Sequence, residues 1–150
     1  MAEGGVTTSI VINCAEDLEE SSSTFYQKLA ERFTENKQQF LLFADESRKN
    51  RVIIARTYKE TITDALEACF CFEGLNLEKY SVSETLEKNT NFPEALQLAI
   101  DTEQKAIEFH SKVASLSKGL LATISTAFDR VAEKRKKRLL ILRSLLAETL

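Results

Sequence analysis

The sequence predicts an all-α protein, built as one domain of four long helices over residues 1–150. Apolar residues recur at spacings of three and four along four separate stretches, which is the pattern of amphipathic helices. The chain holds one proline and four glycines, so little interrupts long helices. No stretch shows the sustained alternation of apolar and polar residues that is typical of strands. Together these observations favour a four-helix bundle.

The first helical hairpin is predicted over about residues 8–60. Its first helix covers about 8–33 and ends at the polar break 34–37. The second helix begins near Gln38, and helix continues, or restarts after a kink, as far as Phe72. The core-facing positions of the first helix are Ile12, Ala15, Glu19, Ser22, Tyr26, Leu29 and Phe33.

A long crossover connection is predicted over about residues 61–92, with loop signals at 74–76 and 89–93 and a short helix over 83–87. Pro93 suits the first turn of a new helix, and Asn91 suits its N-cap. The second hairpin is then predicted over about residues 93–148, with a short loop near Gly119. One long connection between two hairpins is a known topology of four-helix bundles.

The first and third helices are versions of one sequence. Residues 15–30 and 99–114 carry the same residue type at six matching places, namely Ala15 and Ala99, Asp17 and Asp101, Glu19 and Glu103, Phe25 and Phe109, Lys28 and Lys112, and Ala30 and Ala114. The second and fourth helices match more weakly, through Phe40 with Phe128 and Ala44 with Ala132. The pattern indicates a duplicated hairpin, whose two copies bury their apolar faces against each other.

Composition excludes several classes of protein. The net charge of −3 is mild and implies no polyanionic partner, and no apolar run approaches the ~18 residues that span a bilayer. The first residues lack the basic region of a secretory signal, so we expect a cytoplasmic protein. Three cysteines without CxxC spacing argue against a disulfide framework and a zinc site. Cys14, Cys69 and Cys71 are expected to be small buried residues, the last two on different faces of one helix.

The pattern Glu19-x5-Phe25-Tyr26-x2-Leu29-Ala30, followed by Phe40-x3-Ala44 and a second copy, resembles the rubrerythrin-type branch of the ferritin-like superfamily. The resemblance covers about residues 10–145 and implies a ferritin-like four-helix bundle. In that family the first and third helices each offer a Glu, and the second and fourth each offer Glu-x-x-His. These side chains hold two iron or manganese ions inside the bundle.

Only part of this ligand set is present. The six matching positions are Glu19, Ser47, Asn50, Glu103, Arg135 and Arg138. The two glutamates agree with the family, whereas the other four positions carry neither Glu nor His. A shift of one residue on the second helix and of two on the fourth would recruit Glu46 and Glu133, but Lys49 and Lys136 would then stand where His belongs. Each residue of shift would also turn a helix by about 100° away from its apolar face.

All six positions fall on core-facing stripes, where a lone charge costs several kcal/mol. Two glutamates facing two arginines cancel in charge, and Arg can bind a carboxylate through two nitrogens. Ser47 and Asn50 could satisfy the remaining polar atoms. We therefore predict a buried Glu–Arg hydrogen-bond network in place of the metal pair, with no catalytic residue and no cofactor.

Other interpretations of these residues stay open. The arginines lie in the charged run 133–138, which could face water, and Arg138 competes with Leu139 for the inward position. Both glutamates could lie on an exposed surface. His110, the single histidine, matches Tyr26 and stands two turns from Glu103, which is too far to share a metal with it. We expect a packed or partly exposed aromatic ring there.

Three functions are compatible with the sequence. The first is a ferritin-like bundle that has lost its di-iron centre and acts as a non-catalytic binding or structural protein. The second is a rubrerythrin-like oxidoreductase that holds iron or manganese through Glu19 and Glu103. The third is a helical module that contacts nucleic acid through the basic run 133–138, which lacks interleaved aromatic residues. Nucleotide-binding, metalloprotease and esterase motifs are absent.

A protein partner is expected for the first function, and an exposed apolar face between Tyr58 and Phe72 could support a homodimer.

Overall fold

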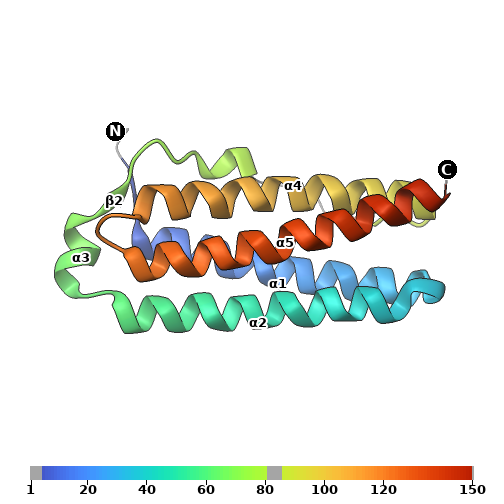
Figure 1. Cartoon of the computed structure of the whole chain (residues 1–150), viewed down its shortest axis with the longest axis horizontal. Coiled ribbons are helices and arrows are strands. Elements are labelled where there is room, and N and C mark those ends of the chain that lie inside the picture. The colour runs from blue at the N-terminus through green and yellow to red at the C-terminus, as the bar shows by residue number, and fades with distance from the viewer. Residues whose placement is uncertain (1–4, 81–85, 150) are drawn as a thin grey trace.

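The computed structural model describes residues 5–80 and 86–149. The described chain is mostly helical, which confirms the predicted all-α class. Four long helices lie side by side in it (Figure 1). They are α1 (Thr8–Arg32), α2 (Lys37–Thr61), α4 (Phe92–Ser117) and α5 (Ala122–Thr149).

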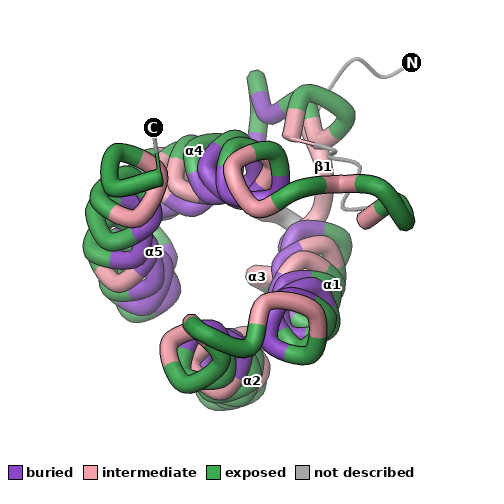
Figure 2. Tube along the Cα trace, turned by 90° about the vertical axis from the view of Figure 1, so that its right-hand side faces the viewer, coloured by how far each residue is buried: buried purple, intermediate pink, exposed green. Residues whose placement is uncertain are grey.

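The chain passes from one end of the molecule to the other along each long helix. Helices α1 and α2 form one antiparallel pair, joined by the 3-10 turn Thr34–Asn36, and α4 and α5 form a second pair (Figure 1). Seen end on, the helices follow the order α1, α2, α5 and α4 around a shared interior, and their buried faces point inward (Figure 2). The two ends of the described chain lie at opposite ends of the molecule.

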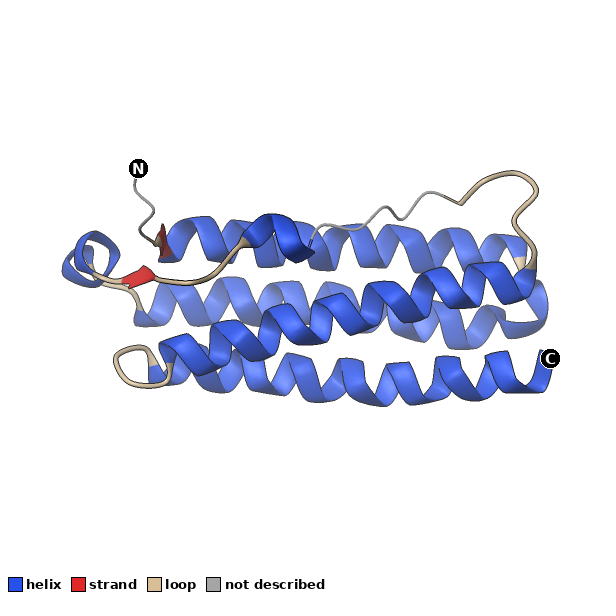
Figure 3. Cartoon of the chain, turned by 90° about the horizontal axis from the view of Figure 1, so that it is seen from above, coloured by secondary structure: helices blue, strands red, loops and turns tan. Residues whose placement is uncertain are grey.

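The connection between α2 and α4 runs the length of the molecule, because α4 starts at the end where α1 finishes (Figure 3). This connection includes the short helix α3 (Asp64–Cys69), the strand β2 (Cys71–Phe72) and a 3-10 turn (Leu77–Tyr80). Strand β2 pairs antiparallel with β1 (Val6–Thr7), just before α1. Of the short helix predicted over 83–87, residues 83–85 lie outside the described residues, and 86–87 are not helical.

Two apolar clusters fill the interior, one toward each end of the long helices. The first is centred on Val11, Ile12, Ile54, Phe109, Val113, Leu121 and Phe128. The second is centred on Phe25, Leu29, Phe40, Leu96, Ala99 and Leu142. Burial of this apolar area provides the main free energy that holds the helices together. Between the clusters lies a layer of buried polar side chains, which forms the candidate site.

The predicted restart of the second helix after a kink is confirmed, since α3 covers Asp64–Cys69, whereas its predicted end at Phe72 is wrong, since Cys71 and Phe72 form β2. Helix α2 ends at Thr61, because the backbone of Ile62 is extended and the hydroxyl of Thr63 accepts the backbone N–H of Leu66 at 3.1 Å. A side-chain cap of this kind starts a new helix. The two short strands were not predicted either, since pairs of two residues leave no periodic signal.

Two further predictions about this connection are wrong. Phe72 is 1% exposed, and Leu66 and Phe70 pack partly against the first apolar cluster, so this stretch is no exposed apolar face. Cys71 in this connection is exposed, in place of the expected burial, and Cys14 on α1 is likewise only partly buried. The side chain of Cys69 lies outside the described residues. Successive residues of a strand point to opposite faces, so the inward position of Phe72 turns Cys71 outward. No helix in the described ranges is long and apolar enough to cross a membrane.

The predicted start of the third helix is confirmed at Asn91. Its side chain accepts the N–H of Glu94, and the side chain of Glu94 accepts the N–H of Asn91, both at 2.9 Å. This reciprocal capping box satisfies N–H groups that the first helical turn leaves free. Pro93 lies in that turn, where a missing N–H costs nothing.

Removal of this cap is expected to destabilise the protein. Asn91→Ala should lower the free energy of unfolding by about 1 kcal/mol, because the first turn of α4 loses its side-chain acceptor. Urea unfolding followed by circular dichroism measures the change. Asn89→Ala, at an exposed turn position two residues earlier, is the matched control. Equal midpoints for the two variants would contradict a stabilising role for the cap.

Candidate functional site: a buried charge layer

The six residues that the sequence singles out lie in the polar layer between the apolar clusters. All six side chains are buried, namely Glu19, Ser47, Asn50, Glu103, Arg135 and Arg138. One or two of them come from each long helix, and hydrogen bonds or ion pairs connect them all. Neither arginine reaches out to solvent, and Leu139 is buried beside Arg138. We refer to these six residues as the charge layer.

Arg135 lies between the two buried glutamates. Its Nε and Nη2 atoms face the two oxygens of Glu19, at 3.2 Å and 2.9 Å. Its Nη1 atom donates to Oε1 of Glu103 at 2.7 Å, and Nη2 also donates to the hydroxyl of Ser22 at 3.0 Å. The planar guanidinium therefore uses both of its open edges on carboxylates, which is the geometry that Arg supplies and Lys does not.

Arg138 takes the second position, nearer to α2. Its Nη1 atom donates to Oε2 of Glu103 and to the hydroxyl of Ser47, both at 3.1 Å. Its Nη2 atom pairs with Glu46 at 2.6 Å. The guanidinium carbon also lies 5.4 Å from the ring centres of Tyr26 and Phe43, which adds cation–π attraction.

Two aromatic residues complete the layer, and the sequence did not assign them to it. Tyr26 on α1 donates its hydroxyl to Oε2 of Glu103 on α4 at 2.5 Å. His110 on α4 places Nε2 3.3 Å from Oε2 of Glu19 on α1. The two aromatic residues match in the internal repeat, and each reaches the glutamate of the opposite helix. The expectation of a packed aromatic ring at His110 is confirmed, since the side chain is fully buried against Phe109 and Phe128. The contact of this ring with Glu19 was not predicted.

Both ring nitrogens of His110 face oxygen atoms. Nδ1 lies 2.8 Å from the carbonyl of Ala106, which can only accept, so Nδ1 carries a proton. A neutral ring would then turn its lone pair toward the carboxylate of Glu19, whereas an imidazolium presents an N–H there. Among the described residues Nε2 makes no regular hydrogen bond, and its approach to Glu19 is an ion pair only when the ring is protonated.

Each fixed charge in and beside the layer has a partner of opposite sign. The cations are Arg135 and Arg138, and the carboxylates are Glu19, Glu103 and Glu46. Glu46 lies at the rim and is partly exposed, while the other four side chains are buried. Buried ions are tolerated when they are paired and hydrogen-bonded, and among these groups only Nε of Arg138 makes no hydrogen bond to the described residues.

The carboxylates are ionised at neutral pH. Burial alone raises the pKa of Glu19, but the charges of Arg135 and His110 outweigh it, and the pKa falls to about 2. Burial likewise raises the pKa of Glu103, and the charges of Arg135 and Arg138 bring the net shift below the ordinary value. Burial and the charge of Glu103 raise the pKa of Tyr26 well above 10. Tyr26 is thus a donor that does not release its proton, and neither glutamate is suited to general acid–base chemistry near pH 7.

The charge layer does not fit a pair of metal ions. A di-metal site needs carboxylate and imidazole lone pairs directed at the ions, whereas both oxygens of Glu19 and of Glu103 here face guanidinium nitrogens. The positions that match the family's Glu-x-x-His on α5 carry the cations Arg135 and Arg138 themselves. Within residues 5–80 and 86–149, no three or more His, Cys, Asp or Glu side chains lie close enough together to hold a metal ion.

The structure does not support the shifted register of the second and fourth helices, which would turn Glu46 and Glu133 inward. Glu46 pairs with Arg138 at the rim, and Glu133 pairs with Lys136 on the surface at 2.8 Å. The two residues that would replace the ligand histidines, Lys49 and Lys136, are exposed. The inward register of α2 and α5 is therefore the one that the apolar stripes indicate.

Truncation of Arg135 is expected to be strongly destabilising. Arg135→Ala should lower the free energy of unfolding by about 3–5 kcal/mol, because it leaves two buried carboxylates without their shared partner. Thermal and urea melts measure the loss, and failure to fold at room temperature is its extreme form. Lys136→Ala removes an exposed charge one residue away and serves as the control. If the two variants melted alike, Arg135 would not hold the layer together.

The ionisation of Glu19 is expected to make the free energy of unfolding depend on pH. Because its pKa in the folded state is about 2, below the ordinary 4.5, the ionised carboxylate adds stability that is complete above pH 4.5 and is lost as pH falls toward 2. Glu19→Gln should be less stable at pH 7 and should lose less stability than the parent between pH 5 and pH 2. Urea unfolding at several pH values tests this, with exposed Glu31→Gln as the control. Equal pH slopes for Glu19→Gln and the parent would contradict it.

In comparisons with protein-family models, with curated proteins and with solved structures, nothing matches this chain.

Proposed function

We propose that this protein is a ferritin-like four-helix bundle in which a buried Glu–Arg network takes the place of a di-metal centre, and that it acts as a non-catalytic binding or structural protein. The observation that carries the proposal is the position of Arg135, whose guanidinium contacts both Glu19 and Glu103. Two metal ions would need the same carboxylate oxygens.

The internal repeat supports the ferritin-like assignment. Glu19 and Glu103 occupy matching places in the first and third long helices and are both wholly buried. Phe25 and Phe109 also match and are both buried. The crossed contacts from Tyr26 to Glu103 and from His110 to Glu19 repeat the same relation in the two halves. A duplicated hairpin predicts such paired environments.

The proposal of a non-catalytic role follows from the state of the polar groups. The buried carboxylates are ionised and occupied, the phenol of Tyr26 keeps its proton, and His110 is held by a carbonyl and a carboxylate. A catalytic acid, base or nucleophile must exchange a proton or reach a substrate. Side chains that are fully buried and mutually paired do neither.

The charge layer weighs against both alternative functions that the sequence leaves open. A di-iron or di-manganese oxidoreductase that uses Glu19 and Glu103 would have to move Arg135 and Arg138 out of the interior. Its metal ions would still lack ligands at the four matching positions that carry neither Glu nor His. A nucleic-acid role through the run 133–138 loses Arg135 and Arg138 to the interior, so fewer charges remain for phosphates. Both alternatives are weaker than the metal-free bundle.

Metal content tests the proposal directly. After anaerobic incubation with Fe(II), Mn(II) or Zn(II) and desalting, we expect no retained metal, because guanidinium groups occupy the carboxylates and repel cations. The measurement is metal per chain by elemental analysis. A variant with S47E, N50H, R135E and R138H restores the family's ligand pattern and is the positive comparison. About two ions per chain in the parent protein would overturn the proposal in favour of the oxidoreductase.

A further inference from the structure

The long helices divide into a basic face and an acidic face. Adjacent helices α2 and α5 together carry thirteen Lys and Arg against six Asp and Glu. Helices α1 and α4 carry four Lys and Arg against nine Asp and Glu. Two of the basic residues, Arg135 and Arg138, and two of the acidic residues, Glu19 and Glu103, lie in the buried charge layer. The remaining difference in charge between the two pairs of helices is on the surface. A surface of one sign attracts a partner of the opposite sign.

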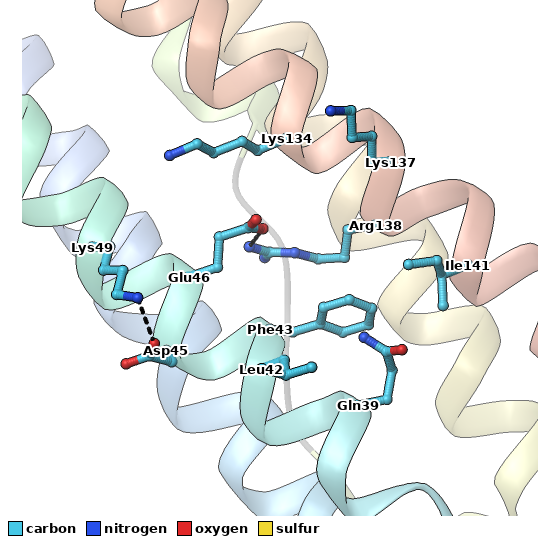
Figure 4. Close-up of a pocket in the computed structure, with 10 residues that line it drawn as sticks. All are labelled: Gln39, Leu42, Phe43, Asp45, Glu46, Lys49, Lys134, Lys137, Arg138 and Ile141. Carbon is cyan, nitrogen blue, oxygen red and sulfur yellow. Dashed lines mark hydrogen bonds and ion pairs between the residues drawn. The ribbon is translucent and has the colours of Figure 1, made fainter.

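A groove lies between α2 and α5 in this basic face (Figure 4). It has a volume of about 400 Å³ and is open to solvent along one side. Its apolar lining comes from Leu42, Phe43 and Ile141, and Leu42 is 63% exposed. On α2 the groove extends from Gln39 to Lys49, which corresponds to roughly 15 Å of helix.

The acidic side chains of the groove are already paired. Asp45 contacts Lys49 at 3.1 Å, and Glu46 contacts Arg138 at 2.6 Å (Figure 4). Lys134 and Lys137 also line the groove, and within the described part of the chain neither forms an ion pair within 4 Å. The charge left over at the rim is therefore positive.

We propose that this groove binds an acidic amphipathic helix of a partner protein, an inference that rests on the binding role proposed above. Apolar side chains of such a helix, spaced at three and four, would cover Leu42, Phe43 and Ile141. Its acidic side chains would pair with Lys134 and Lys137 at the rim. Burial of the groove would also remove water from the Glu46–Arg138 pair and strengthen that contact.

The charges favour this occupant over two others. A second copy bound through the same groove about a two-fold axis would bring two rims of positive charge together, and these rims repel. A nucleic acid would leave the apolar side chains of Leu42 and Ile141 uncovered, since its backbone contacts cations and polar groups. An acidic helix with one apolar face complements both features of the groove.

The test uses the full chain and two labelled peptides. One is an 18-residue helical peptide with leucines on one face and glutamates beside them, and the other carries lysines in place of the glutamates. Fluorescence polarisation measures their binding at about 0.1 M salt, where charge attraction is felt across about 10 Å. We expect the acidic peptide to bind at least about tenfold more tightly than the basic one.

Charge reversal at the rim is the decisive variant. K134E/K137E should weaken binding of the acidic peptide by about tenfold, since two partly exposed ion pairs are lost. R130E/R143E makes the same change of net charge on exposed positions of α5 outside the groove and should leave binding near that of the parent. Leu42→Asp should abolish binding, whereas Leu140→Asp, at a residue that is 64% exposed and outside the groove, should not.

Each other outcome overturns the inference. Equal binding of the two peptides, no binding of either, or equal loss in K134E/K137E and R130E/R143E would each exclude an acidic helix in this groove. A dimer of the parent in light scattering that Leu42→Asp removes and Leu140→Asp keeps would assign the groove to a second copy. Tight, salt-sensitive binding of a DNA duplex that the same variant abolishes would assign it to nucleic acid. Metal content is measured separately, so failure here leaves the metal-free bundle untouched.

Discussion

The pairing of buried charges between Arg135 and the two glutamates is the constraint on which the rest of the structure depends. Glu19 and Glu103 come from α1 and α4, while Arg135 comes from α5. An unpaired ion in this interior would cost several kcal/mol, so the three helices have to keep their faces turned toward one another. Ser47 and Asn50 tie α2 to the same layer through Arg138 and Glu19.

The layer also divides the apolar interior into two clusters, and this division fixes the alignment of the helices along their axes. Apolar side chains alone tolerate sliding, because one Leu or Phe contact resembles the next. A slip of one helical turn, about 5.4 Å, would separate Arg135 from its carboxylates. Specification of a unique alignment by buried polar groups is well attested in coiled coils. Arg138 extends the same layer outward, since its other nitrogen reaches Glu46 at the edge of the surface groove.

The helical periodicity was enough to place the long helices and to bring Glu19, Glu103, Arg135 and Arg138 to the inward stripes, because a period near 3.6 depends on local sequence alone. It could not show which of these groups contact one another. The contacts of Tyr26 and His110 cross between helices 77 and 91 residues apart in the chain, and distances along a single helix gave His110 no partner. The repeat contained a signal for this pairing, since Tyr26 and His110 match while their glutamates also match. The paired strands β1 and β2 were missed because two residues carry no period, and Cys71 was misassigned with them.

The position of the chain ends has a mechanical consequence. Force applied to the first and last described residues acts along the helices, because these ends lie at opposite ends of the molecule. Neighbouring helices would then be loaded in shear, parallel to their shared interface. The ion pairs of the charge layer lie across that interface, so they would bear the load together and would have to break at once. Such an arrangement resists stretching more than one in which contacts open in sequence.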